Sequence, residues 1–364
     1  MKQQSFSLRQ ICLLFITLIP VSKIILLPTL LAFEVGRDAY LSVLLCGAVD
    51  ALALLSLCIA AKRAPEADFF SLLSAFFQKG FSRVLLFLYG VFFLLRAVPP
   101  THSCKLLAIN TLYDVTPSLF VFVPFILCAT YAAWKGLRII LRVNEFFWPF
   151  FFGGVLLLIL LGLSSSDLFN LLPVLEFGPS PVAKGAFFSL PWFGDFMPLL
   201  LLLGKLAPAK RRAKKAILAY AGGIVLTALF FVCFFGVFGE TAVRQTYAIT
   251  KIGKYNTIFS NIGRLDWLPV LLVLMALFVR IALDLACAAS CFSQALSKSA
   301  TPPLLVCSAA LLIFVSLPQV PYADIYHIFS RFLVFAFLPL QLGIPLLTPL
   351  FASRFQKQRK ELPQ

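Results

Sequence analysis

The sequence predicts an all-α membrane protein that crosses the bilayer several times. Hydrophobic residues make up 61% of its 364 residues and charged residues only 13%, and the mean hydropathy is +0.96. A soluble domain of this size has no core large enough to bury so much apolar surface. The apolar residues also gather in long runs, and about 20 residues are enough for one helix to cross a bilayer. We therefore expect a polytopic protein with ten transmembrane helices.

The expected helices follow the apolar runs in chain order. They are Arg9–Ala32, Tyr40–Ala61, Val84–Ala108, Ser118–Trp134, Phe146–Leu163, Ala186–Leu206, Ala216–Phe238, Trp267–Ser293, Pro303–Leu317 and Ile328–Leu350. The first run is long and no small-residue cleavage site follows it, so we expect a helix rather than a cleaved signal peptide. Two connections, Ser164–Gly185 and Gly239–Asp266, are longer than simple turns. The apolar and polar residues of Asp68–Phe81 predict an amphipathic helix at the membrane interface.

The positive charges predict the orientation of the chain. The cations that we assign to the cytoplasmic side are Lys2, Arg9, Lys62, Arg63, Lys79, Arg83, Lys135, Arg138, Arg142, Lys205, Lys210, Arg211, Arg212, Lys214, Lys215, Lys298, Arg354, Lys357, Arg359 and Lys360. The opposite loops carry far fewer, so the positive-inside rule places both termini in the cytoplasm. The net charge of +16 is thus spread over short loops, which argues against a nucleic-acid partner. The run Lys210–Lys215 is either a topology signal or a patch for anionic lipid.

Two of the expected helices are interrupted near the middle of the membrane. The first contains Pro20 and Lys23, and the sixth contains Pro191 and Asp195. Proline removes a helical hydrogen bond, and backbone left unpaired at that depth is tolerated only inside protein or beside a cavity. An ionisable residue there is expensive and points to a functional site. The residues that we expect to bind a ligand at these interruptions are Ile19, Pro20, Val21, Ser22, Lys23, Trp192, Phe193, Gly194 and Asp195.

The interruptions occupy matching places in two halves of the chain. This spacing predicts an inverted repeat, with repeat one at about 9–163, repeat two at about 186–350 and a basic cytoplasmic tail at 351–364, all within one transmembrane domain. In that arrangement we expect Lys23 and Asp195 to face one cavity near the bilayer midplane. The alternative is a pair of ordinary proline kinks with a structural ion pair.

Other charged residues inside the expected helices need partners as well. Arg280 and Asp284 are four residues apart, so they share one helix face and we expect a structural ion pair. Asp50 lies deep in the second expected helix. Arg96 in the third expected helix is also deep enough to need a partner; the alternative is a place nearer the outer interface, where an arginine extends its charge to water.

Nothing in the sequence indicates an enzyme, a cofactor or a metal site. We find no sequence motif of a serine hydrolase or zinc protease. Most cysteines lie in apolar segments, where cysteine behaves as a small hydrophobic residue. Cys287 and Cys291 are one helical turn apart, but no histidine lies near them in the sequence.

Four stretches, taken in order along the chain, resemble one family of membrane proteins. They are Lys23–Pro28 followed by Gly36–Ala39, then Gly136–Glu145, Asp167–Pro173 and Phe193–Asp195. In these stretches the sequence resembles the endospore germination permeases, which are the B subunits of spore germinant receptors within the amino acid–polyamine–organocation superfamily.

The resemblance implies both a fold and a function. The fold is of the leucine-transporter type, with a five-plus-five inverted repeat and broken helices one and six. The implied ligand is an amino-acid-like germinant held between helices one, three, six and eight. The implied partners are the lipid bilayer and the A and C subunits of the receptor, in the spore inner membrane or cell membrane. Two alternatives stay open: a working secondary transporter that couples amino acids to protons, and a scaffold without a ligand of its own.

Overall fold

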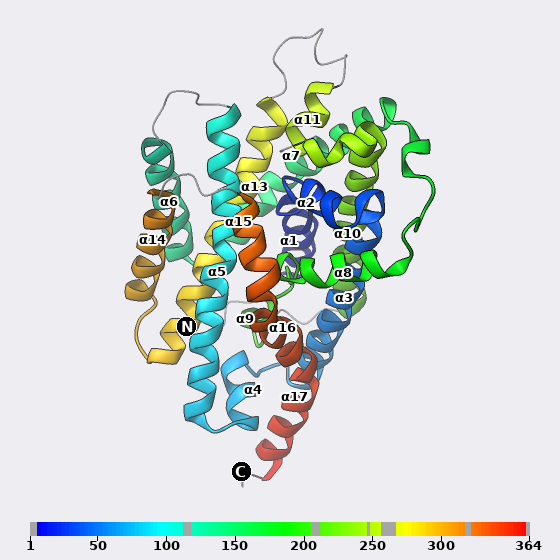
Figure 1. Cartoon of the computed structure of the whole chain (residues 1–364). Coiled ribbons are helices and arrows are strands. Elements are labelled where there is room, and N and C mark those ends of the chain that lie inside the picture. The colour runs from blue at the N-terminus through cyan, green and yellow to red at the C-terminus, as the bar shows by residue number, and fades with distance from the viewer. Residues whose placement is uncertain are drawn as a thin grey trace.

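The computed structural model describes residues 6–111, 118–205, 212–245, 248–255, 267–316 and 322–361. The helices of this part are α1 (Leu8–Val21), α2 (Leu27–Glu34), η1 (Gly36–Asp38), α3 (Ala39–Arg63), α4 (Phe69–Phe76), α5 (Lys79–Thr111), α6 (Ser118–Lys135), α7 (Leu137–Ser164), η2 (Leu168–Leu171), α8 (Pro179–Ser189), η3 (Leu190–Trp192), α9 (Pro198–Leu202), α10 (Arg212–Phe238), η4 (Gly239–Arg244), α11 (Ala248–Tyr255), α13 (Trp267–Leu296), α14 (Thr301–Ser316), α15 (Tyr322–His327), η5 (Ile328–Leu333), α16 (Val334–Leu338), η6 (Pro339–Gly343) and α17 (Ile344–Glu361). The long helices run along one direction of the molecule, with α4 and the C terminus at one end and α11 at the other (Figure 1).

The structure supports the membrane assignment and leaves the count of ten helices as a prediction. Among the described residues, six helical segments are long and apolar enough to cross a membrane. They are Gly36–Arg63, Lys79–Ile109, Leu137–Ser164, Ala213–Arg244, Val270–Leu296 and Asp324–Arg359. Shorter apolar helices lie at Leu8–Val21, Phe122–Lys135 and Thr301–Ser316. An expected transmembrane helix that is broken, or that ends early, is shorter than the roughly 20 residues that one helix needs to cross a bilayer. It is therefore not among the six long segments.

Most of the helices fall into two groups by their packing, and α7 packs against helices of both groups, among them α1 and α13. In the first group, α1 packs against α10, and α3 packs against both α10 and α8. In the second group, α5 packs against α13, and α6 and α14 pack against each other and against α13. Glycines bring the helices of each group close together: a Cβ on Gly47 would lie 2.6 Å from Ile224, and one on Gly90 would lie 2.7 Å from Phe292. Small residues at helix contacts are typical of packing in a membrane.

The last helix is longer than the sequence predicted. It begins at Tyr322 and runs through two π-helical turns, η5 and η6, to Glu361. Residues 351–361, predicted as part of a basic tail, are therefore helical. The reason is tertiary: Phe351 and Ala352 are fully buried, and Arg359 forms an ion pair with Glu66 at 2.7 Å. The sequence beyond Leu350 is rich in basic and polar residues, so hydropathy alone placed the end of the helix too early.

Three other segments differ from the sequence prediction. α8 begins at Pro179, so the predicted loop Ser164–Gly185 contains η2 and the first turns of a helix. The described part of Gly239–Asp266 is helical as well, in η4 and α11. The amphipathic helix predicted within Asp68–Phe81 is α4, but its apolar face is covered by protein. It packs against α17 and α5, and Leu72 and Leu73 are buried there.

Candidate ligand site at the helix breaks

The first helix break follows Pro20. α1 ends at Val21 and α2 begins at Leu27, with a turn between them. The backbone N–H groups of Lys23 and Ile24 both donate to Pro20 O, at 2.8 and 2.9 Å. Pro20 has no N–H to continue the helical ladder. The turn directs the Lys23 side chain back along α1, where Nζ donates to Ile19 O at 3.0 Å.

The second break lies between η3 and α9. Gly194 adopts φ = +76°, a conformation that favours glycine because it lacks a Cβ. Its N–H donates to Asp50 Oδ2 at 2.6 Å, and its carbonyl accepts from Arg96 Nη1 at 2.5 Å. Side chains from two other helices therefore satisfy backbone groups that a continuous helix would have paired internally.

Asp195 lies at the centre of a buried charge cluster. Its Oδ2 accepts a hydrogen bond from Lys23 Nζ, so an ion pair connects the two breaks. Its Oδ1 accepts from Arg96 Nη2 at 3.0 Å and also from Arg280 Nη1. The side chains of these four residues are at most 4% exposed. The Lys23 ammonium also lies 4.6 Å from the centre of the Phe193 ring.

Arg280 and Asp284 form the contact that their spacing predicts. Arg280 Nε donates to Asp284 Oδ2 at 2.9 Å. The spacing gave no sign that Arg280 also binds Asp195. Arg96 is 4% exposed and bound within the cluster, so it has the partner that its depth required, and the alternative place near the outer interface is wrong. Asp195 and the Gly194 carbonyl are partners for the positive charge of Arg96, so the Arg96 side chain does not need to reach water.

Asp50 completes the charge balance of the cluster. Among the described residues, its carboxylate is bound by neutral donors: the Gly194 N–H and the Tyr220 hydroxyl, both at 2.6 Å, and Gln341 Nε2 at 3.5 Å. Three positive side chains and two carboxylates form the ion pairs, so an ionised Asp50 brings the group to neutrality. Neutrality matters here because an uncompensated buried charge is strongly destabilising.

The cluster also joins the two groups of helices. Asp195 and Lys23 belong to the first group, through the breaks in α8–α9 and α1–α2, whereas Arg96 on α5 and Arg280 on α13 belong to the second. The bond between Lys23 and Asp195 lies within one group, and the bonds from Asp195 to the two arginines cross between the groups. Movement of one group against the other therefore requires these crossing bonds to break or shift.

The predicted ligand residues are brought together only in part. Lys23, Phe193, Gly194, Asp195 and the Ile19 carbonyl meet at the cluster. Pro20 forms the turn, and Val21 is fully buried beside it. Trp192 instead donates to Ser330 Oγ at 3.1 Å and stacks on Tyr326.

Beside the cluster, the described residues leave a small cavity. Ser22, Trp192, Arg96 and Arg280 line a cavity of about 20 Å³ beside the cluster, which is close to the space of one water molecule. A cavity of this size is too small for an amino acid.

The sequence did not lead us to two residues that donate to Asp50. Tyr220 lies in an apolar helix, where an aromatic residue looks like ordinary packing. Gln341 was detectable, because an amide in the middle of an apolar span needs partners; it donates to Leu190 O at 2.9 Å.

The chain is similar to transporters of known structure. It matches Mhp1, a nucleobase-cation-symport-1 family transporter in a closed conformation with bromovinylhydantoin bound, with a TM-score of 0.64 and 14% identity over 99% of this chain and 94% of Mhp1. It also matches the inward-facing conformation of Mhp1 (TM-score 0.47, 13% identity, 99% of this chain and 92% of that one) and a substrate-bound, outward-open Na⁺-coupled sialic acid symporter (TM-score 0.44, 12% identity, 96% and 94%). At this identity, the match to closed Mhp1 shows a shared fold.

The family assignment rests on the sequence itself. No curated protein gives a significant match. The profile of a family described as spore germination protein matches residues 6–322. The apolar helices and the transporter fold identify a multi-pass integral membrane protein. Because the family profile covers most of the chain, the protein belongs to the spore germination protein family, as the four resembling stretches predicted.

Proposed function

We propose that the protein is the B subunit of a spore germinant receptor, which senses a small amino-acid-like germinant at the two helix breaks and triggers germination. The observation that carries this proposal is Asp195, buried at one break and bound by Lys23 from the other break and by two arginines from the second helix group. The proposal includes ten spans in a five-plus-five inverted repeat, both termini in the cytoplasm, and A and C partner subunits in the spore inner membrane.

A zwitterion suits this cluster for an electrostatic reason. A ligand with one charge leaves a charged side chain of the cluster buried without its partner, which costs considerable free energy. An amino acid brings an ammonium group for Asp195 and a carboxylate for Lys23, Arg96 or Arg280. One ion pair is then exchanged for two, and every buried charge keeps a partner of opposite sign.

Ligand binding of this kind is coupled to a change of conformation. The ligand must displace bonds from Asp195 to Arg96 and Arg280, and these bonds cross between the two helix groups. A ligand shifts such an equilibrium only by its difference in affinity for the two states. The sensing step is thus the exchange of bonds between the groups for bonds to the germinant.

The alternative is a working amino acid and proton transporter, and Asp50 favours it. A buried carboxylate whose described partners are neutral donors is a candidate for proton binding. Uptake of labelled amino acid into proteoliposomes against an imposed pH gradient separates the two functions. Uptake driven by the gradient, and lost in Asp50→Asn, indicates transport. A germination response without such uptake indicates sensing.

The proposal is tested by the germination response of spores. We expect Lys23→Met and Asp195→Asn to shift the amino-acid concentration required for germination upward by at least about tenfold, since a loss of 1.4 kcal/mol per contact has that effect. Lys298→Met and Asp324→Asn, at exposed positions, are the matched controls and should respond as the unaltered protein does. Unchanged responses in both cluster variants, with normal protein level on a blot, contradict the proposal and favour a purely structural ion pair.

A further inference from the structure

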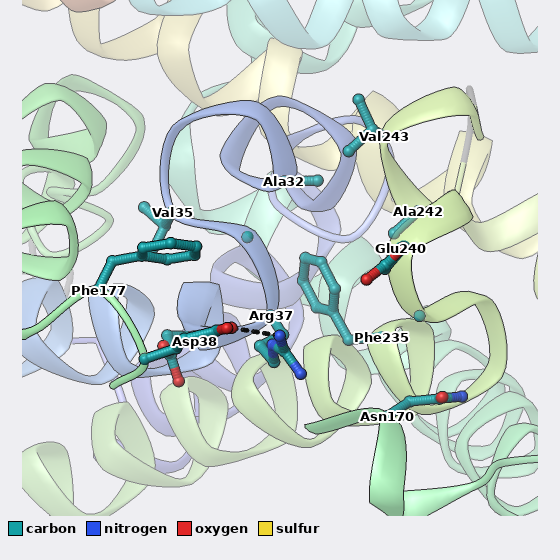
Figure 2. Close-up of a pocket in the computed structure, with 13 residues that line it drawn as sticks. Ala32, Val35, Arg37, Asp38, Asn170, Phe177, Phe235, Glu240, Ala242 and Val243 are labelled. Atoms are coloured by element: carbon teal, nitrogen blue, oxygen red, sulfur yellow. Dashed lines mark hydrogen bonds and ion pairs between the residues drawn. The ribbon is translucent and has the colours of Figure 1, made fainter. Parts of the chain in front are cut away.

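We propose a second ligand site, separate from the helix breaks, that binds a small organic ammonium compound. The site is a cavity of about 300 Å³ between the end of α2, η1, η2, the end of α10 and η4 (Figure 2). We call it the distal cavity, because it lies far from the C terminus: α3 begins beside the cavity and runs from there to the end of the molecule that carries the C terminus (Figure 1). Its residues are not those of the charge cluster, so the proposal does not rest on the proposed germinant site.

The shape of the distal cavity suits a short apolar ligand with one polar end. Its buried wall is apolar, formed by Ala32, Val35, Phe235 and Ala242. Phe177, at its edge, is 76% exposed. The volume lies at the lower end of the range for small-molecule sites, about 300–1,000 Å³. An apolar wall with a few charged groups is the usual composition of such sites.

The charges of the distal cavity favour a positive ligand. Four charged side chains line it: Arg37, Asp38, Glu176 and Glu240. The Arg37 guanidinium already binds Glu176 and the Leu172 carbonyl. Asp38 and Glu240 line the same cavity, and neither forms an ion pair with another described residue. The lining therefore carries an excess of negative charge. Figure 2 shows Phe235 between Arg37 and Glu240 at the cavity.

Asp38 gives an independent sign of a missing donor. It is 4% exposed, and its Oδ2 accepts from the Leu175 N–H at 3.0 Å. Its Oδ1 has no hydrogen-bond partner among the described residues. Most buried polar atoms in proteins are hydrogen-bonded, so an unpaired carboxylate oxygen on a residue that lines a cavity points to a missing donor, which a ligand ammonium group can supply.

An ammonium group fits this set of residues better than a metal ion does. The described residues contain no group of three or more His, Cys, Asp or Glu side chains placed to hold a metal. The cavity does carry two phenylalanines, Phe177 and Phe235, and an aromatic ring face attracts an organic ammonium. The ligand is then an amine whose short carbon chain lies on the apolar wall and whose ammonium binds Glu240 and Asp38.

The test is direct binding of n-butylamine hydrochloride to the purified full chain in detergent micelles. Isothermal titration calorimetry measures the affinity. We expect saturable binding that Glu240→Gln weakens at least about tenfold, which corresponds to about 1.4 kcal/mol. Phe177→Ala should weaken it as well. Glu240 and Phe177 are exposed, so neither change threatens folding. Glu66→Gln, at an exposed acid outside the cavity, should bind as the unaltered protein does. Sodium butyrate and magnesium chloride should not compete.

Several outcomes overturn the proposal. Absence of saturable binding does so, and so does equal affinity in Glu240→Gln. Competition by magnesium chloride would identify a cation site instead. Binding that persists in Glu240→Gln but disappears in Asp195→Asn would place the amine at the helix breaks, which contradicts the distal cavity and leaves the proposed germinant site standing.

Discussion

Lys23 and Asp195 lie 172 residues apart in the chain and form one buried ion pair. The pair connects the two places where helices are interrupted. Arg96 and Arg280 bind the same carboxylate from the other group of helices. The breaks, the charges and the contact between the helix groups therefore meet at a single side chain, and the predictions below test what each contributes.

Asp195→Asn should destabilise the protein more than Lys23→Met does. The first change leaves three buried cations without their common carboxylate, and breaking a buried ion pair costs about 3–5 kcal/mol. The second leaves Asp195 with two arginines, so its effect should be smaller. Thermal unfolding of the purified variants in detergent measures the order. A larger effect for Lys23→Met would show that Asp195 is not the centre of the cluster.

Arg280→Met should be more damaging than Asp284→Asn. Arg280 binds both Asp195 and Asp284, so its loss removes the partner of two carboxylates. Asp284→Asn leaves Arg280 bound to Asp195. The double variant removes one charge of each sign and should recover part of the expression lost in Arg280→Met, measured by blot of the membrane fraction. If the double variant expresses no better than Arg280→Met, Asp284 is not a structural partner.

Gly194→Ala should disrupt the second break. A Cβ there would lie 2.7 Å from the Gln341 side chain and 2.9 Å from Arg96 Nη1, at φ = +76°. Backbone strain of this kind costs about 1–3 kcal/mol. Gly222→Ala is the matched control, because no atom lies within 4 Å of its added Cβ. We expect a lower unfolding temperature for Gly194→Ala alone, and equal temperatures for the two variants would contradict the geometry of the break.

Phe351→Ala should be strongly destabilising, although the sequence predicted that this residue belongs to a basic tail. Phe351 is fully buried, with its ring 4.7 Å from that of Phe76 and 5.7 Å from that of Phe77. Truncation of a buried phenylalanine costs about 3–5 kcal/mol. Phe332→Ala, in the same long helix but 74% exposed, should change the unfolding temperature much less. Similar effects for both would mean that α17 does not cover α4.

The helix breaks were predictable because proline and a charge inside an apolar run both have a physical cost that sequence reveals. Lys23, Gly194 and Asp195 were found in this way. The roles of Arg96 and Arg280 were not, since the partner of a buried cation depends on which helices pack together, and a single sequence carries no record of that packing. The end of the last helix was missed for a related reason: Arg359 pairs with Glu66, far away in the chain, and hydropathy does not report such a contact.

The most direct test of the central claim is equilibrium binding of an amino acid and its two single-charge analogues to the purified chain. The amino acid is the tightest binder in a panel of the twenty standard ones, and the analogues are the matching amine and the matching carboxylic acid. We predict that either analogue binds at least about tenfold more weakly than the amino acid, and that Lys23→Met or Asp195→Asn removes the advantage of the amino acid over one of its analogues. Equal binding of the amino acid and both analogues, or no saturable binding of any amino acid, would contradict the claim that the Lys23–Asp195 pair opens to receive a zwitterion.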